Sequence, residues 1–347
     1  MIHIGRFHRT FSAILPLLIP LVLSAVTHLW NPVGFPAIFS DEDVYIKRAF
    51  EVLNNFNLQS WWPADHPFFG WLFLATVFAL IDYPDSFVNP AALDAHSIEI
   101  LYLVPRVLMG MIAIVDTFLV YKICENRYNK SIAFIASILF AVMPLTWITR
   151  YILLDTIQLP FILSSILFAL YATGSEKAFS LGTRSVMNAQ RVSFLFVLLS
   201  GIFLGIAIFT KIPAIAMIPV VVYLVFSNKA NRRMKILGIW IAPVLMIPLI
   251  WPLNAIYLDE LDSWLEGIIS QTQRQFPLFD WLGWYPGQNS LELFFRIDPV
   301  LMLLGLAGLI FAIVARDRFL LLWIIPFLAF EYLVGYVFFF HLIPLFP

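Results

Sequence analysis

Three consecutive carboxylates stand early in the chain, where an acid–base reaction at a membrane surface could use them. Asp41, Glu42 and Asp43 follow directly after Ser40. In the first turn of a helix such acids are also stabilised by the helix dipole, which would give them a purely structural role. One carboxylate is enough to cap the helix, however, so two are left at the boundary between water and lipid. A base that acts on a lipid-linked substrate would need to sit there.

Four further polar side chains interrupt apolar surroundings. His66 follows Trp61-Trp62-Pro-Ala-Asp, and a lone histidine of this kind is more often structural than catalytic. Arg150 ends one apolar run and could simply reach the membrane surface with its long side chain. Asp155 lies inside the next run, where a carboxylate is costly and indicates function. Lys211 interrupts a later apolar turn, where snorkelling to the surface and contact with a lipid phosphate are equally good interpretations.

The acids begin an element that the pattern predicts to be an amphipathic helix. Ser40 and Asp43 have the spacing of a capping box, in which the third helical residue reaches back to the residue before the helix. Apolar residues then repeat on one face, at Tyr45, Ala49, Val52 and Phe56. We expect this helix to lie on the membrane surface.

The composition requires that such elements sit in a membrane protein. The chain has 347 residues, of which 61% are hydrophobic and 12% charged, with a mean hydropathy of +0.88. A soluble domain carries about twice that charged fraction. The net charge of -1 gives no basic patch for nucleic acid, and the single cysteine, Cys124, excludes an internal disulfide. Scattered prolines without alternating strand segments favour helices over a barrel. The predicted class is an all-α polytopic helical bundle forming one domain over 1–347.

Apolar runs long enough to cross a bilayer define the expected spans. A crossing helix needs about 17 to 25 apolar residues, and about nine runs qualify or nearly qualify by that rule. They lie at 11–30, 100–121, 131–149, 151–172, 192–210, 212–227, 236–253, 299–315 and 319–341. The first run is longer than the core of a secretory signal, so we expect a retained helix. The chain stops at Pro347 directly after an apolar run, which suggests a truncated sequence or a short family member.

Basic residues decide whether a shorter apolar run, 67–81, also crosses. If it does not, and the N-terminus is cytoplasmic, most of the 21 Lys and Arg fall in cytoplasmic loops. If it does, the loops that follow change sides and most of these charges fall outside. We therefore predict that 67–81 is a re-entrant or surface-lying helix. The segments 31–98 and 254–298 then form two long outer loops.

Other polar and small residues within the spans have structural interpretations. Asp116 and Glu331 each stand alone in a span with no basic partner visible in the sequence, so we expect packing or interhelix hydrogen bonds. Gly201 and Gly205 have the Gly-x-x-x-Gly spacing that lets membrane helices approach closely.

In their order and topology these features resemble the GT-C membrane glycosyltransferases, in the branch of protein O-mannosyltransferases and bacterial aminoarabinose or lipopolysaccharide sugar transferases. The resemblance covers residues 11–347. Its departures are Phe68, where the family has a second proline after His66-Pro67, and the absence of the usual further C-terminal spans or domain. The matching features are Asp41-Glu42 with Tyr45, His66-Pro67, Arg106 with Gly110, Arg150 with Leu154-Asp155, Gly205 to Lys211, and His341 to Pro347.

The resemblance implies an inverting transfer of a sugar, mannose or a related one, from a polyprenyl-phosphate donor to a hydroxyl acceptor. It implies Asp41 as general base, with Glu42 and Asp155 orienting the acceptor. A divalent cation, if one is used, would bind at Asp41 and Asp155; no other cofactor is expected. The substrate contacts that follow are Tyr45, His66, Arg150, Asp155, Lys211, Arg274 and Trp284, of which Lys211, Arg150 and Arg274 would neutralise the phosphate.

Two other classes remain open from the sequence, namely a polyprenyl-lipid transporter or flippase and a catalytically inactive subunit. The lack of an inverted repeat and the crowding of polar residues on one face count against transport. The expected partners are the lipid-linked donor, membrane lipids and a protein, lipid or glycan acceptor, but no nucleic acid. We expect a multi-pass protein of the cell membrane with its active site on the outer face. The sequence leaves the sugar, the acceptor and the oligomeric state undetermined.

Overall fold

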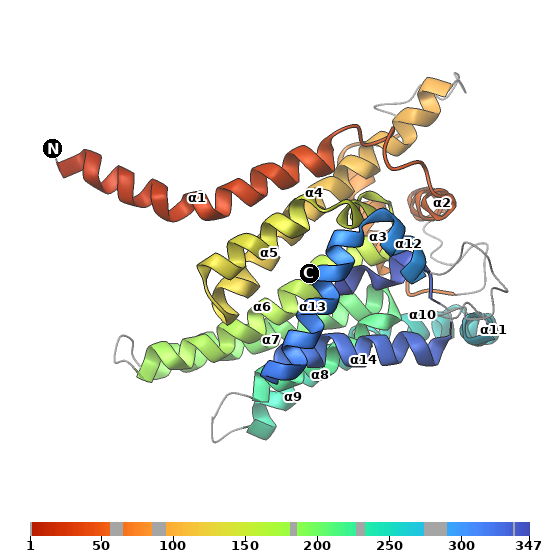
Figure 1. Ribbon diagram of the computed structural model, residues 1–347. Coiled ribbons are helices and arrows are strands. Elements are labelled where there is room, and N and C mark those ends of the chain that lie inside the picture. The colour runs from red at the N-terminus through yellow and green to blue at the C-terminus, as the bar shows by residue number, and fades with distance from the viewer. Residues whose placement is uncertain are drawn as a thin grey trace.

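The computed structural model describes residues 2–55, 65–84, 95–180, 186–226, 233–273, 290–335 and 337–347. Every regular element in these ranges is helical, as the sequence predicts (Figure 1). The α-helices are α1 (Ile2–Leu29), α2 (Ser40–Asn55), α3 (Phe69–Leu80), α4 (Ala95–Arg127), α5 (Lys130–Val142), α6 (Leu154–Ser180), α7 (Val186–Thr210), α8 (Ile218–Phe226), α9 (Arg233–Met246), α10 (Ile250–Tyr257), α11 (Leu261–Gln273), α12 (Ser290–Ile297), α13 (Pro299–Ala315) and α14 (Arg318–Val334). The 3₁₀ helices are η1 (Pro144–Arg150), η2 (Ile212–Met217) and η3 (Phe339–Leu345).

Long apolar helices make up the body of the molecule. Within the described ranges, 4 segments are long and apolar enough to cross a bilayer, or up to 5 if the bent pair of α5 and η1 counts as one span. The 4 segments are 99–127, 154–173, 193–210 and 234–257. Several other expected spans correspond to shorter apolar helices, among them α13 and the α1 residues Ile14–Leu29. The protein is thus an all-helical membrane bundle.

Proline and glycine explain why several expected spans are broken. The run at 131–149 bends by 67° after Val142, at the start of η1, where Pro144 cannot donate the next helical hydrogen bond. The run at 212–227 opens as the 3₁₀ helix η2, which contains Pro213. The last run ends at Gly335, whose left-handed φ of 68° terminates α14 before η3 begins.

The centre of the bundle is the pair α6 and α7, which run side by side (Figure 1). Helix α4 packs against α1, α5 and α6, while α9 covers α7. An added Cβ at Gly205 would lie 2.5 Å from the Pro243 carbonyl oxygen of α9, and one at Gly201 would meet the Trp240 carbonyl. The close helix packing predicted for these two glycines is confirmed.

Two short helices lie in the first predicted outer loop. Helix α2 packs on α3, and α3 contacts α6 and α7. The α3 helix has 12 residues and is therefore only about 18 Å long, too short to cross a bilayer. At this end of the bundle Figure 1 also shows α11 and α12 of the second predicted outer loop.

The last residues fold back into the bundle beside α14. Phe340, His341, Leu342, Ile343 and Pro344 are all buried. The Trp323 indole Nε1 of α14 donates a hydrogen bond of 2.9 Å to the Pro344 carbonyl. The segment also contacts α6, η1 and α12, so residues from the end of the chain line the interior near the start of α6.

Candidate functional site

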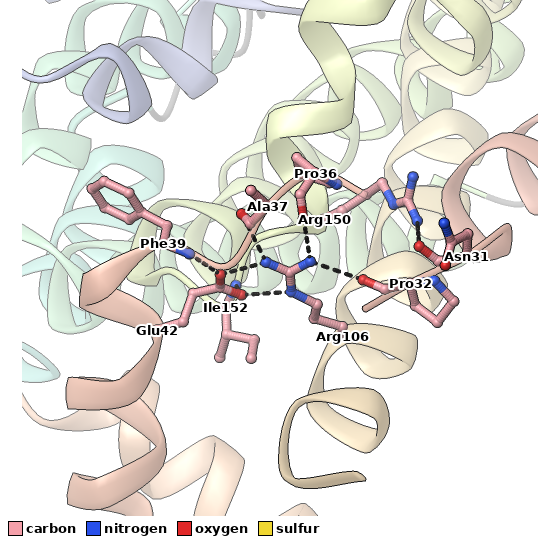
Figure 2. Close-up of polar contacts among 9 residues, drawn as sticks. All are labelled: Asn31, Pro32, Pro36, Ala37, Phe39, Glu42, Arg106, Arg150 and Ile152. Carbon is pink, nitrogen blue, oxygen red and sulfur yellow. Dashed lines mark hydrogen bonds and ion pairs between the residues drawn. The ribbon is translucent and has the colours of Figure 1, made fainter. Parts of the chain in front are cut away.

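The Glu42 carboxylate lies at the start of α2 and is fully buried. Its Oε1 accepts hydrogen bonds from Arg106 Nη2 at 2.6 Å and from the Phe39 amide at 2.8 Å. Its Oε2 accepts from Arg106 Nε at 2.9 Å and from the Ile152 amide at 3.1 Å (Figure 2). A two-point guanidinium contact together with two amide donors occupies both oxygens. Glu42 therefore joins α2 to α4 and to the turn before α6.

These contacts correct the predicted capping register by one residue. Helix α2 begins at Ser40, so Phe39 is the residue before it and Glu42 the third residue within it. Glu42, not Asp43, reaches back to the amide of the residue before the helix. Asp43 instead forms an exposed ion pair of 2.7 Å with Lys47. The expected capping pair of Ser40 and Asp43 is wrong because burial with Arg106 draws Glu42 inward.

Arg106 also holds the segment that precedes α2. Its Nη1 donates to the carbonyls of Pro32 at 2.9 Å and Pro36 at 2.6 Å, and its Nη2 to that of Ala37 at 3.3 Å. The side chain is fully buried, and its guanidinium carbon lies 5.4 Å from the centre of the Tyr151 ring. The sequence pointed to Arg106 only through the family resemblance. No spacing rule could pair it with a glutamate 64 positions away.

Arg150 has a similar place on the other side of this segment. Its Nη2 donates to the Trp30 carbonyl. It also donates, at 3.1 Å, to the Asn31 carbonyl (Figure 2). The side chain is 1% exposed. The structure thus places Arg150 on the backbone that directly follows α1.

Asp155 and Lys211 form a buried ion pair. Lys211 Nζ lies 2.7 Å from Asp155 Oδ2, and the two side chains are 3% and 2% exposed. Asp155 stands in the first turn of α6, and Lys211 directly follows α7. Gln158 supports this junction, because its Nε2 donates to the Lys211 carbonyl and to the Ala207 carbonyl. Snorkelling of Lys211, one of the two interpretations of the sequence, is therefore wrong.

Tyr45 of α2 lies within electrostatic range of Asp155, one member of this pair. It is one helical turn beyond Asp41 on α2 and is 5% exposed. Burial raises the pKa of its phenol well above the ordinary value, and the nearby charges of Asp155, Asp41 and Asp65 raise it further. Carboxylates from α2, from the start of α6 and from the segment before α3 therefore lie within electrostatic range of this ring. Asp41 itself is half-buried, with Ser40 Oγ 3.4 Å from its Oδ1.

A second ion pair binds the His66 segment to α2. Arg48 Nη2 lies 3.0 Å from Asp65 Oδ1, and its guanidinium carbon lies 4.6 Å from the centre of the Trp71 ring. His66 Nε2 lies 4.0 Å from Asp65 Oδ2, and its side chain is 20% exposed. Arg48 shares the face of Asp41 and Tyr45 at helical spacing, so the sequence contains a signal for Arg48 as well. His66 thus lies beside the Arg48–Asp65 pair.

The two acids within predicted spans have different surroundings. Glu331 Oε2 lies 3.7 Å from His341 Nδ1, so it has a basic partner that the sequence did not reveal. Neither oxygen of the buried Asp116 has a hydrogen-bond partner among the described residues. Of the two interpretations of Asp116, packing and an interhelix hydrogen bond, the part of the chain that the structure describes supports only packing.

Two predicted substrate contacts and the predicted cation site are not part of the arrangement described above. Arg274 and Trp284 fall outside the described residues. No group of three or more His, Cys, Asp or Glu side chains is placed to hold a metal ion in the described ranges. A divalent cation at Asp41 and Asp155 would need its other ligands from water or substrate, and it would compete with Lys211 for Asp155.

Comparison with known proteins agrees with the resemblance seen in the sequence. Residues 95–254 match the family described as dolichyl-phosphate-mannose-protein mannosyltransferase. This segment includes Arg106, Arg150, Asp155 and Lys211. No curated protein matches the chain.

The fold is similar to that of the oligosaccharyltransferase from Archaeoglobus fulgidus. Its apo form aligns with a TM-score of 0.57 at 14% identity, covering 97% of this chain and 49% of that one. A form tethered to an acceptor peptide aligns at 0.55 and 13%, covering 97% and 48%. A complex with an inhibitory peptide and a dolichol-phosphate also aligns at 0.55 and 13%, covering 97% and 50%. This chain thus spans about half the length of those proteins.

The predicted resemblance to the GT-C membrane glycosyltransferases is confirmed by the match to the mannosyltransferase family over 95–254 and by the fold of the whole chain.

Proposed function

We propose that this protein is an inverting glycosyltransferase that moves a sugar from a polyprenyl-phosphate donor to a hydroxyl acceptor. The observation that carries the proposal is the buried Lys211–Asp155 pair, whose carboxylate lies within electrostatic range of Tyr45 and Asp41. A lysine supplies charge for a phosphate, and a half-buried carboxylate nearby supplies a base. Sugar transfer from a lipid phosphate requires both.

The reaction needs one base and one cation. The acceptor oxygen attacks the anomeric carbon opposite the phosphate, and Asp41 takes the hydroxyl proton as the new glycosidic bond forms. The bond between the anomeric carbon and the phosphate oxygen breaks, and its electron pair stays with the phosphate. The phosphate leaves as a stable anion, so no acid is required on that side. Lys211 stabilises this charge through a charge-assisted hydrogen bond.

Lys211 must exchange partners during this cycle. In the structure its ammonium is compensated by Asp155 at 2.7 Å. A donor phosphate provides a second anion, so Lys211 can bind it while Asp155 becomes available to orient the acceptor hydroxyl or to hold a divalent cation. Glu42 and Arg150 contribute by holding the first loop, since both are occupied by backbone and side-chain partners. Their role is therefore positioning.

The remaining substrate contacts are proposed by position. His66 and Tyr45 lie around the same carboxylates as Asp41 and would contact the sugar or the acceptor. Arg274 and Trp284 belong to the second outer loop and would cover the donor. Mannose is the proposed sugar, supported by the description of the matching family. A lipid-phosphate donor is supported by the dolichol-phosphate complex of the similar oligosaccharyltransferase. The acceptor is a hydroxyl group of protein, lipid or glycan.

The proposed membrane arrangement places this chemistry on the outer face of the cell membrane. It has nine spans, a cytoplasmic N-terminus and α2 outside. A single cysteine introduced at Val44, which is 43% exposed on α2, tests it in a Cys124→Ser background. An impermeant maleimide should label this cysteine in intact cells. Labelling only after the membrane is opened would contradict the arrangement.

Consumption of labelled polyprenyl-phosphate mannose tests the function. The purified protein is incubated with host membranes as the source of acceptor. We expect transfer by the wild type and loss of transfer in Asp41→Asn, because the amide cannot take the proton. Asp43→Asn is the matched control, since it changes a neighbouring acid that pairs only with the exposed Lys47 in the structure.

The possible outcomes of this assay distinguish a glycosyltransferase from a flippase and from an inactive subunit. Transfer that survives in Asp41→Asn would remove Asp41 from the reaction. Movement of lipid across vesicles without a new glycosidic bond would identify a flippase. No transfer and no lipid movement by a folded wild type would indicate an inactive subunit or a different donor sugar.

A further inference from the structure

The Lys211 ammonium has a second neighbour that comes from the far end of the chain. Lys211 Nζ lies 5.0 Å from the centre of the Phe340 ring, and both side chains are 3% exposed. Among the described residues, Asp155 is the one hydrogen-bond acceptor of this ammonium. The face of an aromatic ring attracts a cation without accepting a conventional hydrogen bond. The ring therefore compensates the charge while leaving two of the three N–H donors unused.

Other rings hold Phe340 in place. Phe338 stacks almost parallel to it, with centroids 5.3 Å apart and an interplanar angle of 8°. Phe39, which precedes α2, packs on it at 5.7 Å, and the His341 ring lies at 4.8 Å. Aromatic rings in such an arrangement restrict one another's rotation. Phe340 is thus a fixed wall of the Lys211 site.

The backbone that carries Phe340 is itself anchored to the bundle. The Trp323 indole donates to the Pro344 carbonyl at 2.9 Å, and His341 Nδ1 lies 3.7 Å from Glu331 Oε2. Phe346 packs on Phe294 of α12 at 5.6 Å. Three residues that follow Phe340 therefore hold this segment against α14 and α12.

We propose that Phe340 is a positioning residue that keeps the Lys211 ammonium in place while it exchanges Asp155 for the donor phosphate. The proposal rests on the proposed role of Lys211 in donor binding. When the ion pair opens, an ammonium in an apolar setting would lose its compensating charge, and the ring face supplies part of it. Because the ring uses no N–H donor, the phosphate oxygens can take these donors directly.

Substitutions at Phe340 separate the electrostatics of the ring from its volume. Phe340→Leu keeps an apolar side chain but removes the ring, whereas Phe340→Tyr keeps the ring face. Phe339→Leu is the matched control for packing within this segment. The Phe339 ring packs on Phe340 at 5.3 Å and on Phe39 and Tyr151, whereas the ring over Lys211 is that of Phe340. The variant thus removes a neighbouring ring but keeps the one that faces the ammonium. Size-exclusion chromatography and thermal unfolding in detergent select variants that remain folded.

Two measurements are made on each variant. The first is the KM for polyprenyl-phosphate mannose in the transfer assay. We expect Phe340→Leu to raise it roughly three- to thirty-fold, the range of a partly desolvated cation–π contact. The second is the rate at which Lys211 is acetylated by an amine-reactive ester, followed by mass spectrometry. Phe340→Leu should increase this rate, while Phe340→Tyr and Phe339→Leu should leave both measurements close to wild type.

The two measurements also distinguish this proposal from the proposed function. If the wild type transfers no sugar, the proposed function fails, but the acetylation series still tests whether the ring holds Lys211. Equal acetylation rates in Phe340→Leu and Phe339→Leu would overturn the positioning role. Where transfer is measurable, a changed acetylation rate with an unchanged KM would overturn it as well.

Discussion

The ion pairs of this protein differ sharply in how much they contribute to its stability. Glu42 and Arg106 are fully buried and complete each other's hydrogen bonds, whereas Asp43 and Lys47, one turn away on the same helix, are exposed. Exposed pairs add little to stability because water screens their attraction and because two long side chains lose conformational freedom when they pair. Removing one member of a buried pair leaves an uncompensated charge in the interior.

Arg106→Met should therefore destabilise the protein strongly. The Glu42 carboxylate would keep its two amide donors but lose its cation, which costs about 3–5 kcal/mol in buried pairs. Thermal unfolding in detergent measures the effect. Lys47→Met is the control and should change the unfolding temperature little. A small effect of Arg106→Met would contradict a stabilising role of the Glu42–Arg106 pair.

The Asp155–Lys211 pair should show strong coupling in a double-mutant cycle. Asp155→Asn and Lys211→Met each leave one buried charge unpaired, while the double variant leaves none. We expect the double variant to be more stable than the sum of the single effects predicts, by about 0.5–3 kcal/mol. Additive single effects, measured by unfolding in detergent, would contradict a direct ion pair.

The sequence indicated the candidate residues but not their partners. Asp155 and Lys211 could be found because each interrupts an apolar run. Their mutual contact could not be predicted, since it depends on where α6 begins and where α7 ends. The capping register was predicted one residue off, because it is decided by Arg106, a distant residue on α4. Phe340 carried no signal, as one phenylalanine among 34 in the chain.

At the scale of elements, glycines and prolines decide how the helices pack and where they stop. The apolar runs predicted where helices lie, because length and hydropathy follow from composition alone. They could not predict the 67° bend after Val142 or the turn between α9 and α10, because proline can either break a helix or be accommodated in one. Pro105 remains inside α4, for example.

Gly205→Ala should destabilise the contact between α7 and α9. The new methyl group would lie 2.5 Å from the Pro243 carbonyl oxygen, so the helices must separate, at a cost of about 1–3 kcal/mol. The same substitution at Gly238 is the control, since a methyl group there meets nothing within 4 Å. Alanine at Gly238 should be neutral or slightly stabilising in a helix. Similar unfolding temperatures for the two variants would contradict the packing shown here.

At the scale of the whole molecule, one carboxylate joins early and late helices at the end opposite to α2. Asp317 precedes α14 and accepts from the Tyr128 hydroxyl at 2.7 Å, from the Phe319 amide at 3.0 Å and from Arg127 at 3.3 Å. Burial raises the pKa of Asp317, but these three donors together hold it below its ordinary value. The ionised form is therefore favoured in the folded protein.

Asp317→Asn should consequently lower stability in a pH-dependent manner. A carboxylate whose pKa is lowered on folding stabilises the protein above its unfolded pKa, at about 4, and this contribution is lost as the pH falls through the folded value. The difference in unfolding temperature between wild type and variant should be full at pH 6 and should shrink below about pH 4. A difference in unfolding temperature that grows below about pH 4 would contradict a lowered pKa of Asp317 in the folded protein.

The four hydrogen bonds of Glu42 have a consequence for how the reaction is organised in space. Asp41 is the residue before Glu42, and Asp155 follows Ile152, whose amide the same carboxylate binds, by three positions. Asp41, the proposed base, and Asp155, the partner of Lys211, are thus both held in position by Glu42. Their separation cannot change unless the hydrogen bonds of Glu42 open. In the proposed reaction, one buried carboxylate that takes no part in bond making would set the width of the gap that the sugar crosses.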